Sequence, residues 1–227
     1  MGERCHLVQR CSFVAGMPRY GQGMDPSVIS ELAEVDATAV VGVGCKVWQL
    51  AQIREGAVVG DNCVIGRGAY VGAGVRVGDN VKLQNLALVY EPAVLGDGVF
   101  VGPGAILTND RNPRSTDPTG HLKSSSDWNA AGVVVAAGAS IGAGAVVLGG
   151  ISIGEWAMVG AGAVVVHDVL DHGLVVGNPA RPIGWVGRSG ERLRADGELW
   201  KCHITGDTYD RTDRGLRLRN AEEVGGL

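Results

Sequence analysis

Residues 35–107 read VDATAVVGVGCKVWQLAQIREGAVVGDNCVIGRGAYVGAGVRVGDNVKLQNLALVYEPAVLGDGVFVGPGAIL, and an aliphatic residue returns at every sixth position. The series has thirteen members and no exception: Val35, Val41, Val47, Ile53, Val59, Ile65, Val71, Val77, Leu83, Val89, Leu95, Val101 and Leu107. A helix favours a period of 3.6 and an ordinary strand a period of 2, so neither accounts for the series. A hexapeptide repeat is typical of a parallel β-helix, in which each hexad supplies one short strand and one corner.

The rest of each hexad fits an all-β prism with three flat walls. A small or β-branched residue such as Ala39, Cys45 or Ala51 stands four positions after each aliphatic residue, and we expect it to point inward as well. Three hexads make a coil of 18 residues, and the period resumes over residues 135–165, so we expect about six coils and a length on the order of 30 Å. Glycine directly follows the aliphatic residue in seven hexads, where we expect tight corners with positive φ. These glycines are Gly42, Gly60, Gly66, Gly72, Gly78, Gly96 and Gly102.

The charge, hydropathy and cysteine content of the chain argue against several classes of function. The chain has 227 residues and a net charge of −4, without basic clusters, which argues against nucleic acid as a partner. It has no run of 18 apolar residues and no signal-peptide pattern, so we expect a cytoplasmic protein without a membrane partner. Among its five cysteines, Cys45 and Cys63 occupy small inward positions. A zinc site built from Cys5, Cys11 and the Cys202-His203 pair matches no ligand spacing, so we predict no metal.

Four segments follow from the pattern. Residues 1–27 lack the period and form an N-terminal arm, and residues 28–182 form the β-helix domain. Residues 108–131 interrupt the repeat with a long polar loop, which is uncommon in a compact domain unless the loop is functional or disordered. Residues 183–227 alternate polar and apolar positions around turns, which predicts a small β appendage.

The 18-residue coil stacks side chains in columns, and polar or bulky residues gather at two of the three corners. One column holds Gln49, Arg67, Asn85 and Pro103 beside Trp48 and Gln84, and another holds Glu55, Ala73, Glu91 and Asn109 beside Arg54 and Tyr90. Gln49 and Asn85 are two coils apart, or about 10 Å. Such a strip suits a small polar ligand, but a solvated wall or a subunit contact explains it equally well. Prisms of this kind usually assemble side by side as trimers.

From Val35 to Gly-Asn-Pro-Ala-Arg at residues 177–181, the chain resembles the left-handed β-helix acyltransferases of the hexapeptide class. In that class this closing motif follows the last coil, and its basic residue, here Arg181, lies near the coenzyme A phosphates. The resemblance implies a left-handed parallel β-helix.

A closer resemblance covers residues 47–186 and rests on several short motifs. They are Val47-Trp48-Gln49, Val81 to Asn85, Val89-Tyr90-Glu91, Phe100 to Pro103, Thr108-Asn109-Asp110, Asn112-Pro113-Arg114 and Pro179 to Trp185. These motifs are similar to those of the nucleotide-sugar N-acetyltransferases, which acetylate a 3-amino group on UDP- or dTDP-linked sugars, including UDP-2-acetamido-3-amino-2,3-dideoxyglucuronate. The resemblance implies homotrimers, acetyl-CoA as donor and active sites between subunits.

The resemblance also implies roles for individual residues. Asn85 is the side chain nearest the acceptor amine. Glu91 and the 108–114 loop, with Asn109, Asp110, Arg111 and Arg114, line the sugar-nucleotide side. The polar columns described above add Gln49, Arg67, Gln84 and Tyr90 as expected substrate contacts. Coenzyme A is contacted by Ala143, Gly144, Ala161, Gly162, Asn178, Pro179 and Arg181. The chain departs from the family at Gln49, where the glucuronate enzymes usually carry His, and at Leu86, where relatives often carry Asn or His.

The histidine count favours an amine as the acceptor. None of the five histidines lies in the first thirteen hexads. An amine of pKa about 8 is roughly one tenth neutral at pH 7, a cost of only ~1.4 kcal/mol, whereas a hydroxyl needs a positioned base. We therefore expect direct attack of the neutral amine on the thioester, with Asn85 accepting a hydrogen bond from it and a backbone N–H stabilising the oxyanion. His121 in the loop leaves O-acetylation open. Arg111 and Arg114 suit a pyrophosphate, or else pair with nearby aspartates.

Three other functions are alternatives to a nucleotide-sugar N-acetyltransferase. A zinc carbonic anhydrase on the same fold needs three histidine ligands, which no coil supplies. A non-catalytic scaffold or binding subunit predicts an uninterrupted prism without the 177–181 motif. An acyltransferase for another amine or hydroxyl acceptor in natural-product biosynthesis keeps the same chemistry and changes only the substrate.

Overall fold

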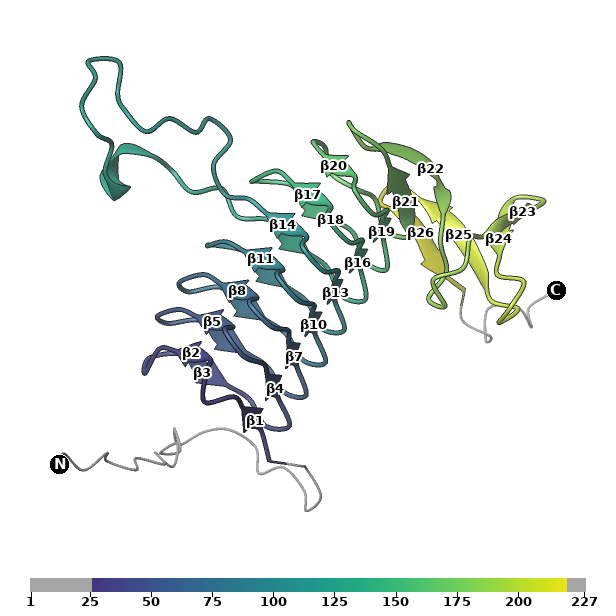
Figure 1. Cartoon of the computed structure of the whole chain (residues 1–227). Coiled ribbons are helices and arrows are strands. Elements are labelled where there is room, and N and C mark those ends of the chain that lie inside the picture. Colours follow the sequence, from purple (N-terminus) through teal and green to yellow (C-terminus); the bar gives the residue numbers. More distant parts are fainter. Residues whose placement is uncertain (1–25, 220–227) are drawn as a thin grey trace.

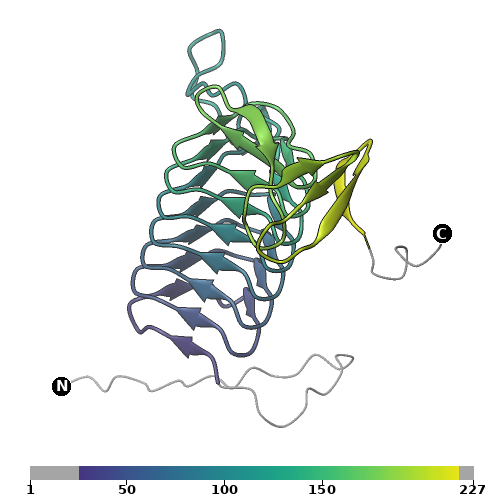
Figure 2. The same cartoon turned by 90° about the vertical axis from the view of Figure 1, so that its right-hand side faces the viewer.

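The computed structural model describes residues 26–219, which form a three-walled prism with a small antiparallel sheet beside its C-terminal end (Figure 1, Figure 2). The chain visits the three walls in turn, so each wall is a parallel sheet whose strands are one coil apart. The parallel β-helix predicted from the six-residue period is confirmed, and its winding agrees with the left-handed form. The predicted N-terminal arm lies outside the described residues except for Pro26 and Ser27.

Each wall is built from two-residue strands. The first wall contains β1 (Val28–Ile29), β4 (Lys46–Val47), β7 (Val64–Ile65), β10 (Lys82–Leu83), β13 (Phe100–Val101), β16 (Ser140–Ile141), β19 (Met158–Val159), β21 (Gly173–Val176) and the antiparallel β22 (Arg181–Trp185). The second wall contains β2 (Glu34–Val35), β5 (Gln52–Ile53), β8 (Tyr70–Val71), β11 (Leu88–Val89), β14 (Ile106–Leu107), β17 (Val146–Val147) and β20 (Val164–Val165). The third wall contains β3 (Val40–Val41), β6 (Val58–Val59), β9 (Arg76–Val77), β12 (Val94–Leu95), β15 (Val134–Val135) and β18 (Ser152–Ile153).

The core is the column of aliphatic residues that defines the period. The second residue of each strand points inward, and Ile53, Leu83 and Val147 are at most 1% exposed. The small residues four positions later, such as Ala51 and Cys63, are fully buried as predicted. The two residue classes alternate around each coil and form one continuous buried cluster, which holds the walls together by burial of apolar surface.

The prism has more coils than the predicted number of about six. The nine-stranded first wall includes one antiparallel strand, which leaves eight parallel strands. Ile29 continues the six-residue period one hexad before Val35 and supplies the first of them. At the other end Val175 pairs with Val159, only 16 residues earlier, so the last coil is two residues short of the period and escapes a search for it.

The corner glycines have a different role from the predicted one. Positive φ occurs three positions after the aliphatic residue, for example at Gly44 and Gly68, and the glycines directly after it do not have positive φ. A Cβ on Gly66 would come within 2.5 Å of the backbone nitrogen of Asn85, and one on Gly102 within 2.6 Å of that of Ala143. At these corners glycine meets a packing requirement and not a conformational one, because neighbouring coils touch there. Other corners carry Trp48 or Tyr90 at the same position.

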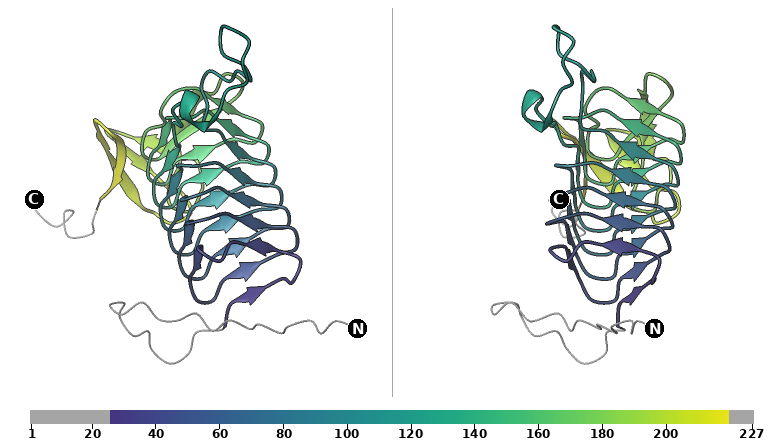
Figure 3. Two further views of the ribbon diagram at one scale, coloured as in Figure 1. Left: turned by 90° about the vertical axis from the view of Figure 1, so that its left-hand side faces the viewer. Right: turned by 60° about the vertical axis from the view of Figure 1, so that its left-hand side comes forward.

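The insertion and the C-terminal appendage leave the prism at different places. Residues 108–131 extend away from the walls after β14 and include a 3₁₀ turn, Ser125–Asp127 (Figure 1, Figure 3).

The predicted β appendage is a four-stranded antiparallel sheet of β23 (Arg194–Asp196), β24 (Leu199–Lys201), β25 (Thr208–Thr212) and β26 (Gly215–Leu218). Leu193, Cys202, Tyr209 and Leu216 form its own small core. The predicted boundary at residue 182 falls inside β22, which pairs with the first wall. Within residues 26–219 no helix is long and apolar enough to cross a membrane.

Candidate active site on two edges of the prism

Three columns of residues run along the edges of the prism, and each contains the second residue after every strand of one wall. The first edge follows the first wall and holds Gln49, Arg67, Asn85, Pro103, Ala143 and Ala161. The second edge follows the second wall and holds Glu55, Ala73, Glu91 and Asn109. The third edge follows the third wall and holds Val43, Asp61, Asp79, Asp97, Ala137, Glu155 and Asp171.

Backbone hydrogen bonds hold the first edge in register. The carbonyl of Asn85 accepts from Gly104 N at 2.9 Å, that of Pro103 from Gly144 N at 2.9 Å, and that of Ala143 from Gly162 N at 2.8 Å. Asn85 and Ala143 are therefore two coils apart, about 10 Å, although 58 residues separate them in the sequence. The structure thus brings the predicted acceptor residue and four predicted coenzyme A residues onto one edge.

Asn85 is fixed by the neighbouring coil. Its Oδ1 accepts the backbone N–H of Arg67 at 2.9 Å. Asp79 and Asp97 cap the preceding coil in the same way on the third edge, each at 2.8 Å. The bond therefore corresponds to an ordinary coil ladder, and it occupies one of the two lone pairs of the amide oxygen. Among residues 26–219 nothing accepts a hydrogen bond from the Asn85 side-chain NH₂, which faces solvent on an exposed residue.

On the first edge, the backbone N–H groups of the coils that follow Asn85 are not capped by side chains of the described residues. Pro103 follows Asn85 in the column and has no N–H, and Ala143 and Ala161 have no side-chain acceptor. Among the described residues no group accepts from Ala143 N. Ala143, Gly144, Ala161 and Gly162 are all exposed, so this part of the first edge is a lane of bare backbone. Within the described residues its open N–H donors are those of Ala143 and Ala161. Such donors suit carbonyl and phosphate oxygens.

The second edge carries a compact polar cluster. Asn109 Nδ2 donates to the carbonyl of Glu91 at 2.7 Å, and the rings of Tyr70 and Tyr90 are 5.2 Å apart. Glu91 packs its carboxylate against Gly72, and its Oε2 is buried without a hydrogen-bond partner within residues 26–219. Burial raises the pKa of Tyr70, and the charge of Glu91 adds to that effect. Leaving a buried carboxylate oxygen without a hydrogen-bond donor costs free energy. Glu91 Oε2 is therefore a candidate acceptor for a donor that residues 26–219 do not supply.

The predicted substrate residues are divided between these two edges. Asn85 and Glu91 occupy equivalent positions on successive edges, so they are a whole wall apart, on the order of 15 Å. Gln49, Arg67 and Gln84 belong with Asn85, whereas Tyr90 and Asn109 belong with Glu91. A single chain therefore does not bring all the predicted substrate residues together.

The inserted loop forms a hollow of about 350 Å³ lined by two predicted residues, Asp110 and Arg114. Its other lining residues are Ser115, Leu122, Lys123, Ser124 and Trp128, which the sequence analysis missed. A tryptophan inside a polar loop was the one signal that could have found them. Arg111 is exposed and does not line this hollow, and Arg114 donates to the carbonyl of Pro113 at 2.8 Å.

His121 is occupied by the turn that contains it. Its Nδ1 is 2.8 Å from Thr119 Oγ1 and 3.8 Å from Asp117 Oδ2, and its side chain is exposed. The pKa of Asp117 is lowered, chiefly by its hydrogen bond from Thr119. The loop extends away from the prism (Figure 3), and within residues 26–219 the His121 side chain contacts only Thr119 and Asp117 of its own turn by hydrogen bond or ion pair.

The closing motif lies beyond the last strand of the second wall. Ala180 N donates to the carbonyl of Val164 at 2.8 Å, which places exposed Asn178 and Pro179 at the C-terminal end of that wall. Arg181, also exposed, begins β22 beside Val176 of the first wall. Arg181 borders a hollow of about 310 Å³ together with His167 and Asp168. Within residues 26–219 its guanidinium donates only to the adjacent carbonyl of Ala180, so no group in this range accepts from most of its donors.

No metal centre is found in the described part of the chain, where no three His, Cys, Asp or Glu side chains cluster. Cys5 and Cys11 lie outside residues 26–219. Cys202 is buried in the appendage, where its Sγ is 3.3 Å from Ser189 Oγ. Hydrogen bonds from Ser189 and Thr205 lower the pKa of Cys202 to about 7.

Comparison with known proteins identifies the repeats. Residues 74–109 match the family described as "Bacterial transferase hexapeptide (six repeats)", and residues 56–85 match "Hexapeptide repeat of succinyl-transferase". A curated relative is the dTDP-3-amino-3,6-dideoxy-alpha-D-galactopyranose 3-N-acetyltransferase of Aneurinibacillus thermoaerophilus, 43% identical over 61 residues. That match covers 27% of this chain and 32% of the relative, so the chain spans about a third of its length.

Two solved structures are similar in part. The acetyltransferase domain of PglB from Neisseria gonorrhoeae FA1090, in complex with acetyl coenzyme A, is 25% identical, with coverage of 70% of this chain and 58% of that one and a TM-score of 0.47. PerB from Caulobacter crescentus, in complex with CoA and GDP-perosamine, is 24% identical, with coverage of 71% and 58% and a TM-score of 0.35.

Proposed function

We propose that the protein is an acetyl-CoA-dependent N-acetyltransferase that acts on the amino group of a nucleotide-linked amino sugar. The observation that carries the proposal is the first edge, where a fixed asparagine amide is followed by a lane of bare backbone. The curated relative is named as a transferase of this kind, and it shares 43% identity with the chain over 61 residues. We expect a 3-amino sugar linked to UDP or dTDP, and a cytoplasmic reaction.

The bare lane suits the pantetheine arm of coenzyme A. Alanine and glycine at residues 143, 144, 161 and 162 leave the surface flat, so an extended thioester can lie along the coils. Arg181, the first residue of β22 beside Val176, has guanidinium donors without an acceptor in the described chain beyond the Ala180 carbonyl, and phosphate groups require such donors. No metal takes part in this proposal.

The first edge supplies two roles at the thioester. Asn85 holds the acceptor amine through the second lone pair of Oδ1, while its free NH₂ donates to the sugar. The neutral amine attacks the thioester carbonyl carbon, and the carbonyl oxygen gains negative charge. We assign the stabilisation of this oxyanion to Ala143 N–H, since nothing in the described chain accepts from it. The C–S bond then breaks, and coenzyme A leaves with the proton that the new amide gives up.

The division of the substrate residues favours a site made by two subunits. If the first edge of one subunit faces the second edge of the next, Asn85 and Glu91 meet in the cleft between them. A closed ring of three prisms gives three such clefts, so the proposed assembly is a homotrimer. The loop hollow with Arg114 and Lys123 carries two cationic groups for the nucleotide pyrophosphate, beside Trp128 for the base.

The proposal is tested by incubating the protein with acetyl-CoA and a panel of 3-amino and 4-amino sugars linked to UDP or dTDP. Release of free coenzyme A thiol and the mass of the acetylated sugar are followed together. We expect turnover with at least one 3-amino sugar. Measurable coenzyme A binding without turnover on any member of the panel would refute the sugar acceptor and favour another amine.

A further inference from the structure

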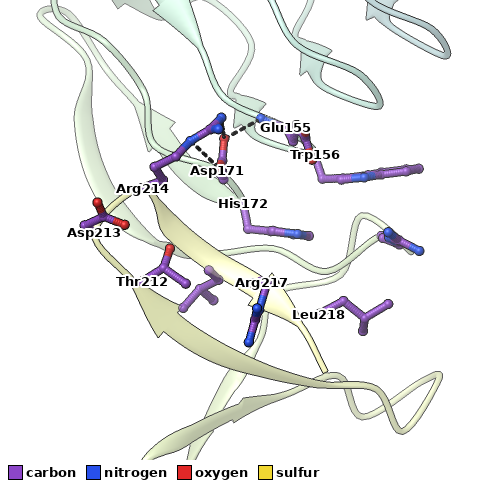
Figure 4. Close-up of a pocket in the computed structure, with 11 residues that line it drawn as sticks. Glu155, Trp156, Asp171, His172, Thr212, Asp213, Arg214, Arg217 and Leu218 are labelled. Atoms are coloured by element: carbon purple, nitrogen blue, oxygen red, sulfur yellow. Dashed lines mark hydrogen bonds and ion pairs between the residues drawn. The ribbon is translucent and has the colours of Figure 1, made fainter. Parts of the chain in front are cut away.

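A third hollow lies on the third edge, away from the candidate active site. It has a volume of about 470 Å³ and is formed where the last coils meet the appendage (Figure 4). We infer that this hollow is a binding site for a phosphate group carried by a nucleotide. The inference rests on this chain's own side chains and does not depend on the proposed acetyl transfer.

The first observation is backbone strain. The third position after each third-wall strand requires positive φ, and it is filled by glycine or asparagine from Gly44 to Gly138. The next two members of the column are Trp156 at φ 55° and His172 at φ 62°, and both line the hollow. A left-handed conformation costs roughly 1–2 kcal/mol per residue for such side chains. Among the described residues the only other large side chains at positive φ are Leu50 and Leu86, which lie on the first edge. Strain of this kind gathers at functional sites.

Packing explains one of the two aromatic residues. The His172 ring is buried, packs edge-on against Tyr209 at 4.9 Å, and places Nδ1 2.8 Å from the carbonyl of Val186. It therefore joins the prism to the appendage. Trp156 is only partly buried, and its ring lies against Gly138, where a Cβ would clash with it. Its role is to support Arg188, whose guanidinium carbon is 5.3 Å from the centre of the ring.

A guanidinium stacked on an indole keeps its N–H edge free for a planar or tetrahedral anion. Arg217 enters the same hollow from β26, and neither Arg188 nor Arg217 has an ion-pair partner within residues 26–219. Two free guanidinium groups with one fixed by stacking are the donor set that phosphate oxygens favour. The hollow is also large enough for a nucleotide.

The carboxylates of the hollow are mostly engaged or distant. Asp171 pairs with Arg214 at 3.3 Å and accepts Glu155 N–H at 2.8 Å, so its charge is compensated. Figure 4 shows Asp213 on the side of the hollow opposite Trp156, with Arg217 between them. Glu155 is left as the one carboxylate near Trp156, and it opposes anion binding. Replacing Glu155 by a neutral residue should therefore strengthen anion binding.

The test is calorimetric titration of the full chain with three probes, dTDP, coenzyme A and 3′-dephospho-coenzyme A, without any amino sugar. Arg188→Gln and Arg217→Gln are the test variants. Arg211→Gln is the matched control, because Arg211 lies on the same sheet over Trp185 at 5.3 Å but does not line the hollow. We expect the affinity for at least one probe to fall about tenfold in both test variants and to stay unchanged in the control.

The probes distinguish the source of the phosphate. Weaker dTDP binding assigns the site to a free nucleotide, whereas weaker coenzyme A binding with unchanged binding of the dephospho form assigns it to the 3′-phosphate. Glu155→Gln should strengthen the same probe about threefold by removing a like charge. If the affinity for every probe is the same in Arg188→Gln and Arg217→Gln as in the unaltered chain, the inference is overturned. Since no acetyl transfer is measured, failure of the proposed reaction leaves this result intact.

Discussion

The first and third edges of the prism have the same backbone geometry but different side chains. On the third edge Asp61, Asp79 and Asp97 each cap a backbone N–H of the preceding coil, at 2.8–2.9 Å. On the first edge Asn85 makes the same bond to Arg67, and the positions above it hold proline and alanine. Within the described residues the third edge therefore closes three successive N–H donors, those of Val43, Asp61 and Asp79, whereas the first edge closes only that of Arg67 and leaves those of Ala143 and Ala161 open.

The comparison separates a residue's structural role from its chemical one. An aspartate would cap Arg67 as well as Asn85 does, so the coil does not require an amide there. What asparagine adds is an NH₂ group facing solvent without a negative charge. Similarly, the coil does not require that Ala143 lack a capping partner. The differences between equivalent positions, and not the positions themselves, mark the candidate site.

The largest expected effect comes from removing the open donor. Ala143→Pro deletes the N–H assigned to the oxyanion, and Pro103 shows that the same column position accepts proline. We expect kcat/KM to fall about 100- to 1,000-fold, the usual effect of losing an oxyanion donor. Ala161→Pro is the matched control, one coil further along, and should keep most of the activity. Equal losses in the two variants, or none in Ala143→Pro, would remove this N–H from the mechanism.

A smaller loss is expected from Asn85→Asp. The aspartate keeps the acceptor for Arg67 N–H but replaces the free NH₂ by a charge, so kcat/KM should fall roughly 30-fold while thermal stability stays within about 1 kcal/mol. Asp79→Asn makes the reverse exchange on the third edge and should leave both quantities unchanged. Steady-state kinetics and thermal melts measure the two effects. If Asn85→Asp retains full activity, Asn85 is only a coil cap.

The two kinds of corner position are also separable by stability. Gly78→Ala places a methyl group within 2.8 Å of Asp97 N, and overpacking of this kind should lower the free energy of unfolding by about 1–3 kcal/mol. Asn80→Gly is two positions later, where φ is 58°, and should change stability by less than about 1 kcal/mol. Denaturant titrations of the two variants give the comparison. A harmless Gly78→Ala would contradict the packing explanation of these glycines.

The sequence predicts the regular part of the molecule well because its period is tied to the geometry of the coil. Once three hexads make a coil, positions 18 residues apart must stack, and Gln49, Arg67 and Asn85 fall on one edge without further information. The period also predicts the buried residues, because the same two positions of each hexad face inward. The period gives the wrong reason for the corner glycines, for which it predicts positive φ. Spacing alone does not distinguish a position that needs positive φ from one where neighbouring backbones touch.

The irregular parts could not be predicted in the same way. The last coil is short, so Asp171 stands six residues after Val165, where an aliphatic residue is expected, and Val169 pairs with Ile153 instead. The hollow of the inserted loop is built by turns around Asp117 and Ser124, which follow no period. The third-edge hollow depends on how the appendage meets the prism, and no repeat encodes that contact.

The proposed division of the site between subunits can be tested by complementation, with the smallest expected effect. Asn85→Asp impairs only the first edge, and Glu91→Gln changes only the second. Subunits of the two kinds, coexpressed and purified together, should form mixed trimers in which about a quarter of the clefts combine two unaltered edges. Activity should therefore rise to about a quarter of the wild-type value, well above either variant alone. If both edges of one chain formed the site, every cleft would carry one defect, and mixing would restore nothing.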